Sequence, residues 1–174
     1  MKKTLIYGLV LIAASAPASA WEVSTNQDPM TDAKTVAVVQ DADASNPMNP
    51  WALMFKCWEG KPDQTSLAIL TPEDFNSAAQ YPSSIDVKLR IDKAETFTIV
   101  LAPIQLGGKL ILATRAGLSV AVFDTIKAMQ DAKKQLAFQV LTEVHTVNAA
   151  GSSNAIGKMI SGCGLDMSKN PADQ

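Results

Sequence analysis

The residues with the clearest chemical potential are the two cysteines of the chain, Cys57 and Cys163. Two cysteines allow one intramolecular pairing, and closing a loop of about 100 residues removes on the order of 4 to 5 kcal/mol of unfolded-state entropy in the chain model. A reactive thiol pair or a metal site is the alternative. The cysteines lack C-x-x-C spacing, however, and the single histidine, His145, does not complete a zinc set. We therefore predict a structural disulfide, with no metal site and no cofactor.

Ser153 and His145 are the residues that could support hydrolysis. The stretch "AGSSNA" (150–155) invites comparison with a nucleophile elbow. That motif belongs to a parallel α/β sheet and is followed by its histidine, whereas His145 precedes Ser153. We interpret Ser152 or Ser153 as a helix N-cap, and His145 as a structural residue beside Glu143 on a strand surface. No catalytic residue is predicted, and the chain is expected not to be an enzyme.

Asp28 and Asp32 could be imagined as a carboxylate pair or as the corner of a calcium site. The residues around them lack the dense oxygen-ligand spacing of a calcium loop. We interpret Asp28-Pro29 as a turn and Asp32 as a side chain that hydrogen-bonds to the backbone.

Three tryptophans could stack on sugars, anchor a partner or fill the core. The strand predicted over 51–58, "WALMFKCW", places Trp51 on one face with Leu53, Phe55 and Cys57, which is the expected core face. Trp58 falls on the opposite face, and Trp21 lies at the start of the expected mature chain. Trp21 and Trp58 are therefore the candidates for a contact surface.

Residues 1–20 have the three parts of a secretory signal peptide: Lys2 and Lys3, an apolar run from Leu5 to Ala14, and Ala18-Ser19-Ala20 before the expected cleavage point. The apolar run is shorter than the roughly 20 residues that a membrane-spanning helix needs. We expect cleavage after Ala20 and no membrane insertion of the mature chain. The periplasm is the expected location, with release from the cell as the alternative.

The chain has 174 residues and a net charge of −2, which falls to −4 when residues 1–20 are removed. A mildly acidic chain without a basic run gives no electrostatic footprint for nucleic acid or anionic lipid, so neither is expected as a partner. Its length favours one domain. We place a disulfide-closed, β-rich domain at 21–166 and a polar, flexible tail at 167–174.

Hydrophobic periodicity predicts mainly antiparallel strands followed by helices late in the chain. The segment 85–92, "IDVKLRID", alternates apolar and polar residues without a break, as in a sheet with one solvated face. Gly107-Gly108 predicts a hairpin turn, and 41–50 and 72–84 are expected as loops. Strands are expected at 21–24, 35–40, 51–58, 66–71, 85–92, 96–103, 109–114 and 136–147, and helices at 118–134 and 151–164. This order indicates an α+β fold, a β-sandwich or curled sheet with two helices in the C-terminal half.

Several of these segments resemble, in the same order, the VasI/TagO-type family of periplasmic proteins associated with type VI secretion. They are an opening "WEVS" followed by "DPMTD" after a signal peptide, a strand with "FKC", then "VKLRID", "AMQDAKKQLAFQV", and a glycine-led helix "GSSNAIGKMISGCG" that ends on a second cysteine. The resemblance implies a structural N-terminal segment, paired cysteines and no catalytic residues to carry over. It also implies a secretion-linked role.

These observations favour an exported, non-enzymatic accessory protein that binds an envelope or secretion-system protein. Inhibition of a cell-wall lytic enzyme is the alternative, because small disulfide-closed export products suit that role equally well. An envelope hydrolase that uses Ser153 or His145 is the third reading.

Overall fold

The computed structural model describes residues 21–43, 51–76, 80–115, 117–169 and 171. The predicted signal peptide lies outside the described residues. Within them the elements are β1 (Glu22–Gln27), β2 (Lys34–Asp41), β3 (Ala52–Trp58), β4 (Lys61–Asp74), β5 (Ile85–Ile91), β6 (Phe97–Leu106), β7 (Lys109–Ala113), α1 (Val120–Asp131), β8 (Gln135–Val140), β9 (Glu143–Asn148) and α2 (Ser152–Cys163).

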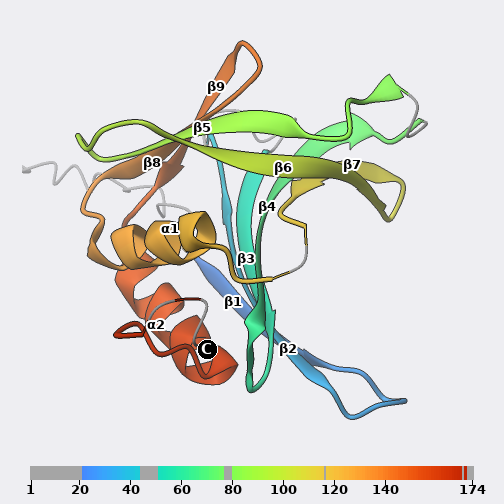
Figure 1. Ribbon diagram of the computed structural model, residues 1–174, viewed down its shortest axis with the longest axis vertical. Coiled ribbons are helices and arrows are strands. Elements are labelled where there is room, and N and C mark those ends of the chain that lie inside the picture. The colour runs from blue at the N-terminus through green and yellow to red at the C-terminus, as the bar shows by residue number, and fades with distance from the viewer. Residues whose placement is uncertain (1–20, 44–50, 77–79, 116, 170, 172–174) are drawn as a thin grey trace, which may run out of the picture.

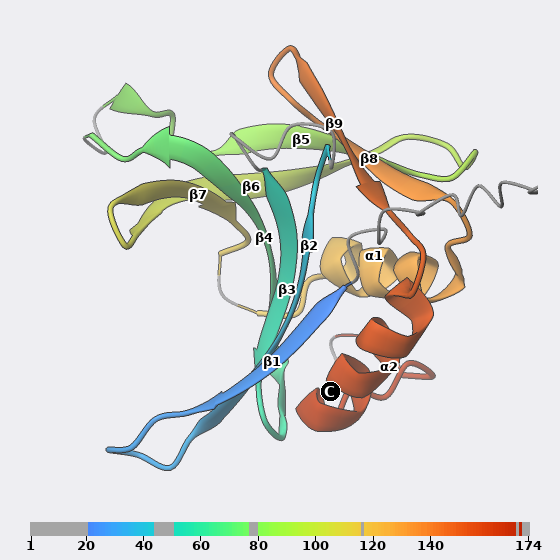
Figure 2. The same ribbon diagram turned by 180° about the vertical axis from the view of Figure 1, so that it is seen from behind.

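All neighbouring strands pair antiparallel in a nine-stranded sheet of order β1-β2-β3-β4-β7-β6-β5-β8-β9. This confirms the mainly antiparallel α+β class, and of the two architectures expected it is the curled sheet. Strands β1 to β4 run along the long axis of the molecule, and β5 to β7 cross above them (Figure 1). Both helices lie on the same side of β1 to β4, as Figure 2 shows from behind.

The curl brings the two ends of the sheet together. Ala42, just after β2, forms a β-bridge with Val147 of β9, and the backbone amide of Asp43 donates to the carbonyl of Thr146 at 2.8 Å. These bonds cover part of the β9 edge. The sheet is therefore a partly closed barrel rather than two separate layers.

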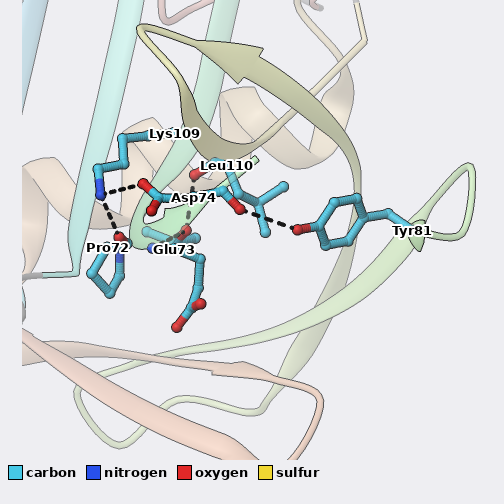
Figure 3. A network of polar contacts seen from close by, with 7 residues as sticks. Pro72, Glu73, Asp74, Tyr81, Lys109 and Leu110 are labelled. Atoms are coloured by element: carbon cyan, nitrogen blue, oxygen red, sulfur yellow. Dashed lines mark hydrogen bonds and ion pairs between the residues drawn. The ribbon is translucent and has the colours of Figure 1, made fainter. Parts of the chain in front are cut away.

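A polar network holds the long strand β4 where it turns into the crossing strands (Figure 3). The register between β4 and β7 shifts between Leu70 and Asp74. Across this irregularity the Lys109 ammonium donates to the carbonyl of Pro72 at 2.9 Å and to the Asp74 carboxylate at 2.7 Å, and the Thr71 hydroxyl donates to the carbonyl of Leu110 at 2.9 Å. The expected loop at 72–84 therefore begins three residues later than we predicted, because β4 continues to Asp74.

Three other expectations about elements were wrong in their limits. The segment 136–147 is two strands, because Leu141 turns the chain with a φ of 54° between β8 and β9. The strand expected at 66–71 is longer, because β4 begins at Lys61 and the turn before it is confined to Glu59-Gly60. The helix expected at 118–134 is the shorter α1, which begins after Ser119, whose hydroxyl accepts the Val122 amide at 3.3 Å. The Gly107-Gly108 turn is confirmed, with both glycines at positive φ.

The core lies between the curled sheet and the two helices. Strand β5 buries Ile85, Val87, Leu89 and Ile91 and exposes the charged residues between them, as its alternation predicts. Helix α1 contributes Val122, Phe123, Ile126 and Met129, and α2 contributes Ala155, Ile156, Met159 and Cys163. Gly162 lies so close to β2 that a Cβ there would sit 2.9 Å from the Val36 side chain. Only a residue without a side chain allows this approach of helix to sheet.

Candidate functional site

The disulfide determines which face of β3 points into the core and which points to solvent. Cys57 and Cys163 are bonded, with Cα atoms 5.8 Å apart and both side chains fully buried, which confirms the predicted bond. It ties the end of α2 to β3. Because successive side chains of a strand point to opposite faces, Trp58 faces away from α2. A disulfide of this kind fits an oxidising, extracytoplasmic environment.

Trp58 lies beside a surface hollow on this helix-free face. The hollow has a volume of about 480 Å³ and is lined by Trp58, Asp63, Gln64, Ser66 and Gly117. The Trp58 ring is half-buried, and the Lys56 ammonium lies 5.8 Å from its centroid. The arrangement combines a large aromatic surface with neighbouring carboxylate, amide and ammonium groups. An aromatic anchor with polar neighbours is the composition typical of protein-binding surfaces.

Trp21, the other candidate for a contact surface, is buried instead. Its side chain is 8% exposed and its indole nitrogen donates to the backbone carbonyl of Asn148 at 2.9 Å. The ring therefore fastens the start of β1 to the end of β9. Of the two tryptophans proposed for contact, Trp58 is the one that reaches the surface.

His145 belongs to a buried cluster that we did not expect. It is 7% exposed, and its Nδ1 lies 2.6 Å from the Asp43 carboxylate, while Nε2 lies 3.5 Å from the exposed Glu143 carboxylate. Trp51 stacks on the imidazole with 4.1 Å between ring centroids, and Phe138 packs against it at 5.1 Å. The expected surface pair with Glu143 is thus the longer contact, because the strand turns His145 inward towards Asp43.

Asp43 is the central acceptor of this cluster. Its second carboxylate oxygen accepts the Thr146 amide at 2.9 Å and lies 3.3 Å from the Thr146 hydroxyl. Partial burial acts to raise the pKa of Asp43, but the hydrogen bonds from Thr146 and His145 outweigh it, so the net pKa is lowered. The carboxylate therefore stays ionised and closes the sheet between the end of β2 and β9.

The two serines that could have served as nucleophiles join the helices to each other. The Ser152 hydroxyl donates to the carbonyl of Met129 at 2.8 Å, and the Ser153 hydroxyl donates to the carbonyl of Gln130. The predicted serine N-cap is wrong, because Gly151, with a φ of 85°, occupies that position and no side chain caps the helix. Neither hydroxyl is directed to His145, whose polar contacts in the described structure are carboxylates.

Asp28 and Asp32 hold the turn between β1 and β2. The Asp28 carboxylate accepts the Met30 amide at 2.8 Å, and Asp32, at a φ of 55°, accepts the side-chain amide of Gln27 at 3.0 Å. Asp28 is thus the turn residue that the sequence predicts, whereas Asp32 bonds to a side chain instead of the backbone. Among the described residues, no three of the His, Cys, Asp and Glu side chains are grouped closely enough to hold a metal ion.

Two structurally important aspartates were missed from the sequence. Asp43 lies within a stretch that reads as a loop by composition, and Asp92 ends a strand as one charged residue among several. In the structure Asp92 has a φ of 50° and its carboxylate accepts the amides of Lys133, Lys134 and Gln135, 41 to 43 residues away. The only signal in the sequence is that aspartate tolerates a left-handed backbone, which is too common to single them out.

No protein-family model, curated protein or solved structure matches this chain. Neither described helix is long and apolar enough to cross a bilayer. The fold and site together define a disulfide-closed, mainly antiparallel α+β protein that has an aromatic surface hollow on the helix-free face of its sheet.

Proposed function

We propose that the chain is an exported, non-enzymatic accessory protein of the periplasm that binds another envelope protein through the surface around Trp58. The observation that carries this proposal is the half-buried Trp58 ring beside the hollow lined by Asp63, Gln64 and Ser66. Aromatic side chains supply large contact area at low conformational cost, which makes them frequent anchors in protein interfaces. The resemblance to the VasI/TagO-type family supports a partner within a secretion apparatus.

The arrangement of Ser153 and His145 supports a role other than hydrolysis. A nucleophilic serine needs a base within hydrogen-bond reach, and the base needs an orienting partner. Here the serine hydroxyl donates to a carbonyl of α1, and the histidine is enclosed by Trp51 and Phe138. Binding, rather than covalent chemistry, is what the exposed side chains around Trp58 can perform.

The test is site-specific photo-crosslinking in the host cell. A photoreactive side chain at Gln64, on the rim of the hollow, should give a covalent adduct with a defined envelope protein. The same side chain at Lys88, on the exposed face of β5, is the matched control and should not give that adduct. The substitution Trp58→Ala should remove the Gln64 adduct, while Trp58→Phe should retain part of it.

The melting temperature of each variant serves as the folding control. An adduct at Gln64 that survives Trp58→Ala in a folded protein would contradict the proposal, as would the same adduct at Lys88. An adduct with a cell-wall lytic enzyme would instead identify the inhibitor function.

A further inference from the structure

The two edges of the sheet differ in how they are covered. Strand β9 is partly covered by Ala42 and Asp43. Strand β1 has β2 on one side and no strand on the other in the described part of the chain. Helix α2 packs across the faces of β1, β2 and β3, and the β1–β2 hairpin extends away from the helices (Figures 1 and 2). An uncovered edge is a template for pairing with another strand.

The hydrogen bonds of the hairpin show which backbone groups this edge offers. The Asp28 amide donates to the carbonyl of Ala33 at 2.9 Å, in register with the pairs of the β1–β2 ladder. In an antiparallel ladder such residues alternate with residues whose amide and carbonyl point away from the partner strand. The outward groups of β1 therefore belong to Val23, Thr25 and Gln27.

Within the described part of the chain, this edge has few of the features that commonly prevent pairing. Its ladder with β2 runs through all six residues of β1 without a bulge, and the strand contains neither proline nor lysine. Natural edges are commonly protected by such residues or by a covering segment. The single charge on β1 is that of Glu22.

We propose that β1 is a self-association edge, which pairs antiparallel with β1 of a second copy of this chain around a two-fold axis perpendicular to the sheet. Such an axis places residues of the same face opposite each other. Centred on Ser24, it sets Ser24 against Ser24, Val23 against Thr25, and Glu22 against the neutral Asn26. No like charges meet in this register, and the outward groups of Val23 and Thr25 become hydrogen-bonded partners.

One of the two neighbouring registers that keep the same faces together is less favourable. Centred on Thr25, it sets Glu22 of each copy against Asp28 of the other. Opposed carboxylates destabilise a strand pair. Of these two registers, the one centred on Ser24 is therefore the more favourable.

The predicted dimer is weak and depends on concentration. Six residues of one strand are far fewer than the roughly 20 to 30 residues per side of a standard interface. Sedimentation equilibrium of the purified chain, from micromolar to millimolar concentration, should therefore show a reversible monomer–dimer equilibrium.

Charge-swap variants test the register directly. Ser24→Lys and Ser24→Asp each oppose like charges at the two-fold axis, so each alone should weaken association roughly tenfold or more. An equimolar mixture of the two variants should associate at least as tightly as the unmodified chain, because an ammonium then opposes a carboxylate. Asn26→Lys is a second variant, and it should strengthen association because its ammonium faces Glu22 of the other copy.

Unchanged melting temperatures establish that the variants fold. A chain that stays monomeric at millimolar concentration overturns the proposal. If crosslinks to another protein in the host cell are then lost in the Ser24 variants, the edge binds that different protein. Dimerisation that neither Ser24→Lys nor Asn26→Lys alters overturns it as well. The β1 edge lies two strands from Trp58. Self-association of the purified chain and the Gln64 adduct in the host cell are separate measurements, so the failure of one is distinguishable from the failure of the other.

Discussion

Single aspartates join segments that are far apart in the sequence. Asp92 binds three consecutive backbone amides that follow α1, and Asp43 binds His145 and Thr146 more than 100 residues away. The hydrogen bonds from Lys133, Gln135 and Lys134 lower the pKa of Asp92. That from the Met30 amide lowers the pKa of Asp28 in the same way. At the residue scale, this protein depends on ionised carboxylates that accept backbone amides.

These lowered pKa values predict a loss of stability in acid. A carboxyl group whose pKa is lower when folded than its unfolded value of about 3.9 stabilises the protein above that value, and the contribution disappears as pH falls through the folded pKa. The melting temperature should therefore decline from about pH 5 downwards, where the unfolded chain takes up more protons. Asp92→Asn, which tolerates the same left-handed backbone, should lower the melting temperature at pH 7 and make this decline shallower.

The matched control is Asp86→Asn, on the exposed face of β5. Thermal unfolding from pH 2 to pH 7 measures both variants. A decline that is equally steep in Asp92→Asn and in the unmodified chain would contradict the role of Asp92.

At the scale of elements, the placement of α2 depends on its contact with β2 and on its disulfide to β3. The helix ends at Cys163 and is capped by Gly164, whose φ of 69° and backbone amide close the last turn. Two glycines inside the helix differ in their surroundings: Gly162 faces Val36, whereas a Cβ at Gly157 would meet no atom within 4 Å. The pair separates the effect of helix propensity from that of packing.

We expect opposite results from alanine at these two glycines. Gly162→Ala should destabilise the protein by about 1 to 3 kcal/mol, because its Cβ overlaps the Val36 side chain. Gly157→Ala should stabilise it by about 0.5 to 1 kcal/mol, since alanine is the better helix former. Urea unfolding gives both values. Equal effects would mean that α2 does not pack on β2 as closely as described.

At the scale of the whole molecule, one covalent bond links the first half of the sheet to the last helix. Cys57 and Cys163 are 106 residues apart in the sequence. A loop of this size constrains the unfolded chain strongly. It also holds α2 over β1, β2 and β3, so the core between helix and sheet depends on it.

Replacing both cysteines should therefore have a large effect. In Cys57→Ala/Cys163→Ala the free energy of unfolding should fall by about 3 to 5 kcal/mol, a substantial part of the roughly 5 to 15 kcal/mol typical of a domain. Chemically reduced, unmodified protein is the control for lost packing volume. Urea unfolding of all three forms checks the prediction, and a change below about 1 kcal/mol would show that the bond is dispensable.

The sequence by itself determined the class of the fold, the disulfide and the outward direction of Trp58. Alternation in "IDVKLRID" and in "WALMFKCW" reports local burial, which depends on the strand period and needs no knowledge of distant residues. The turn at Gly107-Gly108 is local in the same sense. The cysteine pairing followed because two cysteines have one possible partner each.

The tertiary structure alone decided the rest. The closure of the sheet through Asp43 and His145, the burial of Trp21 against Asn148, and the use of Ser152 and Ser153 to join the helices all depend on contacts between distant segments. Strand order also came only from the fold, and with it the identity of β1 as an edge strand of the described sheet. Sequence patterns record which side of an element is buried, but they do not record which distant element lies against it, because many partners satisfy the same period.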